Sequence, residues 1–146
     1  MQVSDKGIVL IKQFEGLRLQ SYLCSGNVWT IGWGATEIYG TKVKKGDVLT
    51  IEEAVQLLKY DIKKFEDLVN TRISTSITQN QFDALVSHSF NTGGSDTLFY
   101  LINKKEDKKK IREWFENTYI TAQGKLLKGL VNRRVTEANL FFLDEL

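Results

Sequence analysis

Residues Phe14 to Gly34 have the sequence FEGLRLQSYLCSGNVWTIGWG, which is the most informative part of the chain for its fold. It begins at the end of an apolar helix pattern and continues through two runs of strand-forming residues. Eight residues separate Glu15 from Cys24, and five separate Cys24 from Thr30. We expect a carboxylic acid at a helix end and, on a tight hairpin, a thiol and a hydroxyl. Such an arrangement can hold a proton donor across a cleft from two groups that bind water.

The residues at the start of the chain predict an amphipathic helix over positions 4–15. Ser4 is a residue type that caps helix N-termini, and Gly16 can take the left-handed conformation that ends a helix. Glu15 would then lie in the last helical turn, where the negative end of the helix dipole favours the neutral form of a carboxylic acid. A general acid needs that protonated form.

Turn-forming residues inside the stretch predict a hairpin and a small sheet. Gly26-Asn27 is a two-residue turn signal between apolar or aromatic runs, and residues 28–31 favour a strand. Gly32, Gly34 and Gly40 then interrupt the extended chain with loops. We therefore expect one small sheet directly after the first helix.

Helix signals dominate the remainder of the chain. The segment Thr50-Ile51-Glu52-Glu53 forms a capping box, which opens a long helix over about residues 50–70. Further helices are predicted to begin near Thr78 and Ser95, to include residues 111–119 and to span residues 131–142. The apolar face of the long helix would consist of Ile51, Val55, Leu58, Ile62, Phe65 and Val69. Because the chain has no proline to stop a helix early, the predicted fold class is α+β, mostly helical.

The spacing of Glu15, Cys24 and Thr30 resembles the active-site region of the phage-type lysozymes (endolysins), the muramidases that cut the sugar strands of bacterial cell walls. The family pattern is Glu, eight residues, Asp or Cys, five residues and Thr, and this chain has the Cys variant. Two later segments also resemble the family. They are residues 89–94, SFNTGG, and residues 129–134, GLVNRR, with Glu137 and Ala138 beyond them.

This resemblance implies a single lysozyme-like catalytic domain over residues 1–146. A small β-hairpin lobe would span about residues 15–50, and a linking helix about residues 50–70. The helical lobe would span about residues 71–146 and would include the N-terminal helix at 4–15.

The resemblance also implies the chemistry. The enzyme would hydrolyse the β-1,4 bond between N-acetylmuramic acid and N-acetylglucosamine in peptidoglycan and so lyse the host cell. Glu15 would be the general acid, while Cys24 and Thr30 would position the attacking water. Cys24 stands where many relatives have Asp. The substrate-binding residues implied by the later segments are Arg133, Asn91, Gly93 and Gly94.

Cys24 leaves several alternatives open. A free thiol has a pKa of about 8.5 and is largely protonated at neutral pH, and a nearby Glu15 carboxylate would reduce the thiolate fraction further. Cys24 would then be a poor base, although it could still help Thr30 to orient a water. It could instead be the nucleophile of a thioglycosyl intermediate, or a small buried apolar residue.

Other functions also stay open at this point. A lytic transglycosylase would need Glu15 but no held water, and a catalytically weak wall-binding module would keep the cleft without turnover. A thiol peptidase would need Cys24 together with His88, but His88 lies among apolar residues of a predicted helix, which favours a core position. One departure from the family pattern is Ala35, because many relatives have His there; a stabilising contact of that His would be absent.

The composition excludes several classes of protein. With 146 residues, 42% of them hydrophobic and 26% charged, the chain suits one compact domain. A net charge of +2 does not indicate a nucleic-acid binder. One cysteine permits no intramolecular disulfide, which fits a reducing compartment, and one cysteine with one histidine cannot form a metal site of soft ligands. We therefore expect no metal and no cofactor.

The expected partner is bacterial peptidoglycan. We find no membrane-spanning or signal-anchor segment in the sequence, since the first apolar run, residues 8–11, is too short. We accordingly expect a monomer without stable membrane insertion that resides in the host cytoplasm until release and then acts on the cell wall. Release would require a separate membrane-permeabilising protein, a holin.

Overall fold

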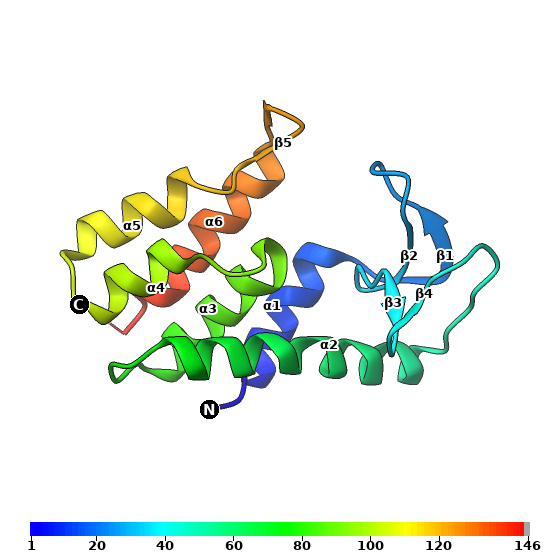
Figure 1. Cartoon of the computed structure of the whole chain (residues 1–146), viewed down its shortest axis with the longest axis horizontal. Helices are drawn as coiled ribbons and strands as arrows, with labels where there is room; N and C mark the ends of the chain where they lie inside the picture. Colours follow the sequence, from blue (N-terminus) through cyan, green and yellow to red (C-terminus); the bar gives the residue numbers. More distant parts are fainter. Residues whose placement is uncertain (145–146) are drawn as a thin grey trace. The chain divides into compact units, whose positions relative to one another are not determined.

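A computed structural model describes residues 1–144 of the chain. The chain divides into two compact units, one of residues 9–64 and the other of residues 1–8 together with the chain from residue 65 onward. Two helices, α1 (Asp5–Glu15) and α2 (Ile51–Arg72), contribute residues to both units (Figure 1). The predicted class is confirmed: helices dominate, and the strands are short and antiparallel.

The unit of residues 9–64 contains two small hairpins. One pairs β1 (Arg18–Leu23) with β2 (Trp29–Gly32), and the other pairs β3 (Glu37–Ile38) with β4 (Thr41–Lys42). On its other side, β1 bonds to the segment that precedes α2: Leu49 N donates to Leu19 O at 2.8 Å, and Ser21 N donates to Asp47 O at 2.9 Å. The β1 strand therefore has hydrogen-bond partners on both edges.

The predicted helix caps are present. The Ser4 hydroxyl accepts a hydrogen bond from Gly7 N at 3.2 Å and starts α1, and Gly16, with φ +68°, ends it. The α2 capping box is complete, since Thr50 N donates to Glu53 Oε1 at 2.9 Å and Glu53 N donates to Thr50 Oγ1 at 3.1 Å. Local side-chain chemistry thus defines the start of both helices, as the sequence predicted.

The apolar face of α2 begins one turn later than predicted. Ile51 is 60% exposed, whereas Leu58, Ile62 and Val69 are buried together with Ala54. Helical side chains point back toward the N-terminus, so a residue in the first turn projects beyond the helix start. The prediction for Ile51 was wrong for this reason, although the periodicity was right.

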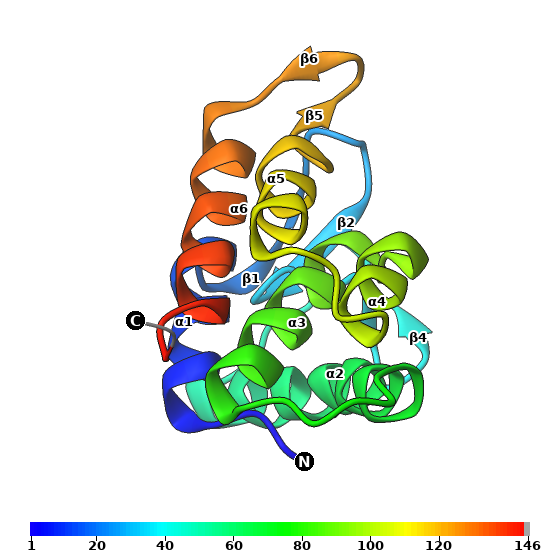
Figure 2. The same cartoon turned by 90° about the vertical axis from the view of Figure 1, so that its left-hand side faces the viewer.

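The second unit is a group of packed helices: α3 (Gln79–Thr92), α4 (Asp96–Asn103), α5 (Lys108–Asn117) and α6 (Lys128–Phe141). Thr78 forms the predicted capping box with Gln81, and Ser95 caps α4. The α6 helix lies beside both α3 and α5 (Figure 2). Between α5 and α6, the rings of Phe115 and Phe141 pack with centroids 5.4 Å apart, and both residues are buried.

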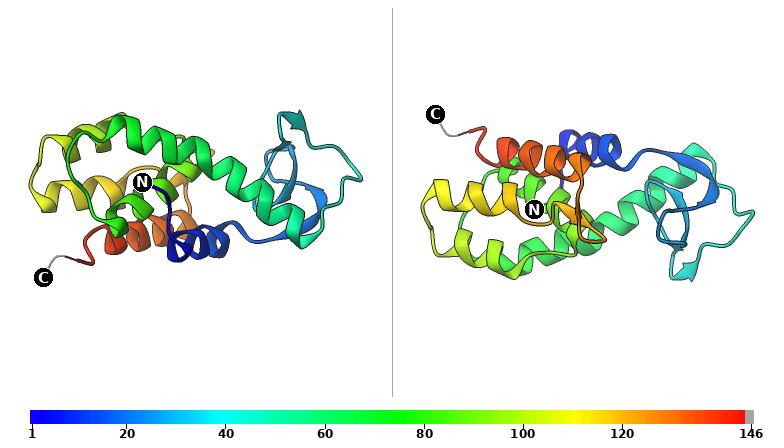
Figure 3. Two further views of the ribbon diagram at one scale, coloured as in Figure 1. Left: turned by 90° about the horizontal axis from the view of Figure 1, so that it is seen from below. Right: turned by 90° about the horizontal axis from the view of Figure 1, so that it is seen from above.

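A third hairpin precedes α6, in a segment for which the sequence predicted no strand. It pairs β5 (Thr121–Ala122) with β6 (Lys125–Leu126) and is visible in orange beside α5 and α6 (Figure 3). Its connection is Gln123-Gly124, with φ of +53° and +76°. The expectation of a single small sheet was therefore wrong, because strands of two residues are too short to show a period-two pattern.

Asp61 is an acidic residue on the partly buried side of α2. Burial is the main cause that raises the pKa of its carboxyl to about 6, and the nearby negative charge of Glu37 adds to the rise. The native state therefore holds the Asp61 proton at pH values where the unfolded chain has already lost it. Native stability should consequently fall as the pH rises from about 4 through 6.

We predict that Asp61→Asn stabilises the protein at pH 7.5 and has no effect near pH 4. The gain should be about 1 kcal/mol, since partial exposure screens the charge. Urea denaturation at the two pH values measures it. Glu37→Gln, which removes only the secondary cause, should give a smaller gain of the same sign. An equal effect of Asp61→Asn at both pH values would contradict the prediction.

Candidate functional site

The carboxylate of Glu15 lies against the backbone of a glycine. Glu15 is the last residue of α1, and Gly34 follows β2 with φ +80°. A methyl group added to Gly34 would lie 2.9 Å from Glu15 Oε2 and 3.6 Å from Cδ. The end of α1 and the chain after β2 therefore meet at the carboxylate that the sequence nominates as the acid.

The turn that carries Gly34 is tightly closed. Ile31 N donates to Ala35 O and Ala35 N donates to Ile31 O, both at 2.8 Å, and both residues are buried. Inside the turn, the ring of Trp33 is buried, with Lys12 Nζ 4.7 Å from its centroid. Trp33 is thus a core residue. Ala35 pairs with Ile31 through its backbone.

Cys24 and Thr30 lie on one face of the β1–β2 hairpin. Tyr22 is paired with Thr30 in the register, and Cys24 N donates to Val28 O at 3.0 Å just beyond the last pair. Side chains of directly opposed residues share a face, and so do those two positions apart along a strand. The thiol and the hydroxyl are therefore diagonal neighbours, and the turn at Asn27, with φ +60°, sets this register.

Hydrogen-bond donors lower the pKa of the Cys24 thiol below its ordinary value. The largest contribution comes from the backbone N–H of Val28, followed by the N–H of Gly26 and the Thr30 hydroxyl, while slight desolvation opposes them. Donors directed at sulfur favour the thiolate. The shift raises the thiolate fraction relative to an unperturbed thiol.

Thr30 is buried, and its hydroxyl has one hydrogen with two possible acceptors. In the structure the hydroxyl donates to Val28 O at 3.0 Å, which leaves its lone pairs able to accept a hydrogen bond. The same hydroxyl is also within hydrogen-bonding reach of the Cys24 sulfur.

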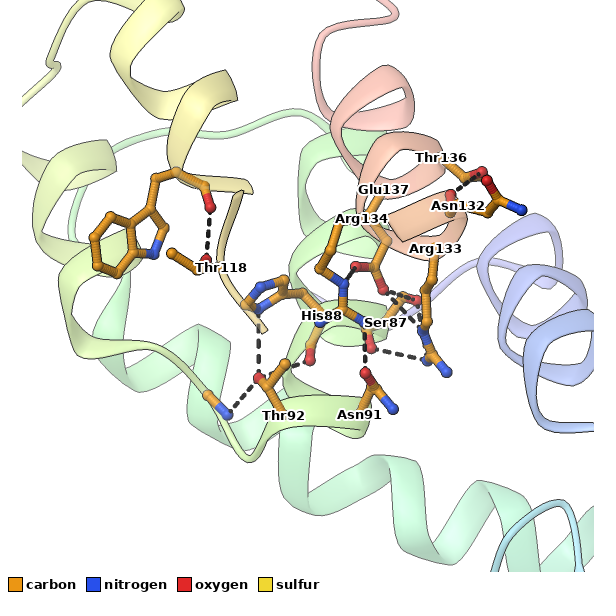
Figure 4. Close-up of polar contacts among 12 residues, drawn as sticks. Ser87, His88, Asn91, Thr92, Thr118, Asn132, Arg133, Arg134, Thr136 and Glu137 are labelled. Carbon is orange, nitrogen blue, oxygen red and sulfur yellow. Dashed lines mark hydrogen bonds and ion pairs between the residues drawn. The ribbon is translucent and has the colours of Figure 1, made fainter. Parts of the chain in front are cut away.

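Two candidate substrate-binding residues belong to a buried polar cluster in the second unit (Figure 4). Arg133 is 3% exposed; its Nε donates to Glu137 Oε2 at 3.2 Å, and its Nη2 donates to Ser87 O at 3.1 Å. The Asn91 side-chain oxygen accepts a hydrogen bond from Arg134 Nη2 at 2.6 Å. Both residues have structural partners, and their contact with substrate stays a prediction.

The two glycines that follow α3 have conformational roles. Gly93, with φ +87°, ends the helix and donates its N–H to Ser89 O at 2.7 Å. Gly94 has φ +101°, and a methyl group there would lie 2.8 Å from Leu68 Cδ2. Helix termination explains Gly93, and close packing explains Gly94. Substrate binding by these two glycines stays a prediction.

His88 is a core histidine, as predicted. It is 1% exposed, and its ring packs edge-on against Phe115 at 5.3 Å and Tyr119 at 5.6 Å. Burial, reinforced by the positive charges of Arg134 and Arg133, lowers the pKa of His88 to about 3. A buried neutral imidazole is unsuited to the thiol-peptidase alternative.

Across residues 1–144, no three His, Cys, Asp or Glu side chains are grouped so as to hold a metal ion. No described helix combines the length and the apolar character needed to cross a bilayer.

A model of the phage lysozyme family matches residues 12–137, which include Glu15, Cys24 and Thr30. The chain belongs to this family. As a phage lysozyme, it is of the endolysin type that lyses peptidoglycan.

Several relatives of this phage lysozyme share most of its length. The endolysin of Acyrthosiphon pisum secondary endosymbiont phage 1 is 39% identical over 97% of this chain and 98% of its own. A solved endolysin from Escherichia coli O157:H7 phage FAHEc1 has 40% identity and a TM-score of 0.88, covering 100% of this chain and 96% of that one. The muramidase domain of SpmX from Asticaccaulis excentricus has 31% identity and a TM-score of 0.81, covering 96% and 97%.

Other relatives are longer. The endolysin of Bacillus phage PZA is 40% identical over 97% of this chain, but the match covers only 55% of that protein. The phage lysozyme described here thus corresponds to about half of this relative.

Sequence reasoning missed the charge arrangement around Arg134. Arg134 is fully buried, and its Nε lies 3.1 Å from Glu137 Oε1, so two guanidinium groups share one carboxylate. The Ser87 hydroxyl also donates to Glu137 Oε2, at 2.6 Å. The spacing Arg-Arg-x-x-Glu could have indicated this cluster, because residues three and four apart are neighbours on a helix.

We predict that Glu137→Gln destabilises this phage lysozyme by about 3–5 kcal/mol, because it removes the negative charge that two buried guanidinium groups share. Urea denaturation followed by circular dichroism measures the loss. Glu113→Gln, at an exposed position of α5, is the control and should change stability by less than about 0.5 kcal/mol. A Glu137→Gln variant as stable as this control would contradict the prediction.

Proposed function

We propose that this protein is an N-acetylmuramidase that hydrolyses the β-1,4 bond between N-acetylmuramic acid and N-acetylglucosamine in peptidoglycan. The proposal rests on two features that both lie within residues 9–64. At the end of α1, the Glu15 carboxylate lies against a closed turn. On the β1–β2 hairpin, the Cys24 thiol and the Thr30 hydroxyl share one face. The match to the phage lysozyme family includes both features, and a similar solved structure is named a muramidase domain.

Glu15 is the proton donor in this proposal. Cleavage of a glycosidic bond requires a proton on the departing oxygen and a nucleophile at the anomeric carbon. Glu15 supplies the proton and becomes a carboxylate as the bond breaks. Its place as the last residue of α1, against the backbone of Gly34, supports this role.

Cys24 and Thr30 hold the attacking water. The water oxygen bonds to the anomeric carbon on the face opposite the leaving group, and the proton that the water gives up is released to solvent. The hydrogen-bond donors around sulfur lower the pKa of the Cys24 thiol, which supports its role as an acceptor for the water. The Thr30 hydroxyl oxygen accepts a second hydrogen bond from the water. Glu15 then takes up a proton from solvent, which restores the starting state.

Glu15→Gln should lower the rate of peptidoglycan cleavage about 10²–10⁴-fold, because the amide keeps the shape and cannot donate the proton. The measurement is turbidity loss of purified cell walls at matched concentrations of folded protein. Glu52→Gln provides the control, since Glu52 is an exposed carboxylate in the first turn of α2. Near-native lysis by Glu15→Gln would refute the assignment. Products with an anhydro end in mass spectrometry would instead identify a lytic transglycosylase.

Cys24→Asp should remain active, and Cys24→Ser should keep partial activity, because a carboxylate or a hydroxyl can also hold the water. Alkylation of Cys24 should inactivate the enzyme by filling the water position. The deciding measurement is the anomeric configuration of the first product from a soluble oligosaccharide. Inversion supports a held water. Retention, or a covalent sugar adduct on Cys24, would show that the thiol is a nucleophile.

A further inference from the structure

The turn formed by residues 32–34 contacts the Glu15 carboxylate, the group that donates the proton in the proposed mechanism. We propose that Gly34 is a positioning residue for the Glu15 carboxylate and that the Lys12–Trp33 pair holds the turn in place. This inference rests on the proposed function, because it assigns these residues to the acid step.

The first support is the close approach at Gly34. A methyl group there would lie 2.9 Å from Glu15 Oε2, which is closer than side-chain carbons normally approach. The carboxylate would have to move by some tenths of an ångström to make room. The absence of a side chain at Gly34 therefore sets where the carboxylate rests.

A second glycine of the same turn separates this effect from backbone strain. Gly32 has φ +64° and Gly34 has φ +80°, so each position disfavours residues with a side chain. A methyl group at Gly32, however, would meet only Leu49 Cδ1 at 3.8 Å and Ala54 Cβ at 4.0 Å, which are ordinary contacts. Alanine at Gly32 thus introduces the strain without touching Glu15.

The third support is the pair that joins the turn to the helix. Lys12 lies three residues before Glu15 on α1, and residues at this spacing share a helix face. Its Nζ lies 4.7 Å from the centroid of the buried Trp33 ring, and Trp33 directly precedes Gly34. The pair therefore connects the face of α1 that carries Glu15 with the residue beside the positioning glycine.

Small displacements of a catalytic group have large effects on rate, and an error of about 1 Å can reduce it by about 10²-fold. Positioning of the acid should act on the chemical step rather than on substrate affinity, so kcat should change while KM is kept.

The main test compares Gly34→Ala with Gly32→Ala. Both variants are assayed with a soluble peptidoglycan fragment well below their melting temperatures. Both should lose a similar amount of thermal stability. Gly34→Ala should lower kcat by about tenfold or more with KM within about twofold, whereas Gly32→Ala should keep the parent kcat. Equal kcat values for the two variants, whether high or low, would overturn the proposal.

A second pair of variants keeps the test decisive if Gly34→Ala does not fold. Lys12→Met keeps the length of the side chain and removes the cation; it should lower kcat several-fold at unchanged KM. Lys12→Arg restores a cation over the ring and should recover kcat. Parent-like kcat in Lys12→Met, or failure of Lys12→Arg to recover it, would count against the role of the pair.

The Glu15→Gln variant separates failure of the positioning role from failure of the proposed function. An active Glu15→Gln variant would refute the function itself. An inactive Glu15→Gln variant combined with parent-like kcat in Gly34→Ala would refute only the positioning role.

Discussion

The unit of residues 9–64 depends on one steric constraint, the contact between the Glu15 carboxylate and a backbone that carries no side chain at Gly34. This contact requires that α1 end where Gly16 ends it and that the chain after β2 turn sharply at a glycine. The paired backbone bonds of Ile31 and Ala35 close that turn. The carboxylate proposed as the acid therefore lies where the backbone at Gly34 leaves room for it.

Buried and partly buried acidic side chains have different surroundings in the two units. In the second unit, Glu137 is buried between two guanidinium groups and a hydroxyl, which offset part of the desolvation that raises the pKa of its carboxyl. Asp61, in the other unit, is partly buried beside Glu37, and burial and that neighbouring charge favour its neutral form. Stability and its pH dependence therefore arise at residues separate from the proposed catalytic ones.

The β1–β2 hairpin surrounds the Cys24 thiol with hydrogen-bonding groups. Sulfur is a weak hydrogen-bond acceptor as a thiol and a much stronger one as a thiolate. The N–H groups of Val28 and Gly26 make the largest contributions to the lowered pKa of the thiol, and the Thr30 hydroxyl lies within hydrogen-bonding reach of the sulfur. The hairpin backbone thus favours a hydrogen-bond acceptor at this position, provided that the turn keeps its geometry.

The features that depend on neighbours along the chain could be predicted from the amino-acid order. These include the caps at Ser4 and Thr50, the terminator Gly16, the hairpin turn before Val28 and the spacing of Glu15, Cys24 and Thr30, because each follows from residue type and short-range bonding. Other features became apparent only in the folded chain: the contact of Gly34 with Glu15, the lowered pKa of Cys24, the burial of Arg134 with Glu137 and the exposure of Ile51. Each of these depends on which distant groups approach and how much water they exclude, and a linear pattern does not encode distances between segments that meet only on folding.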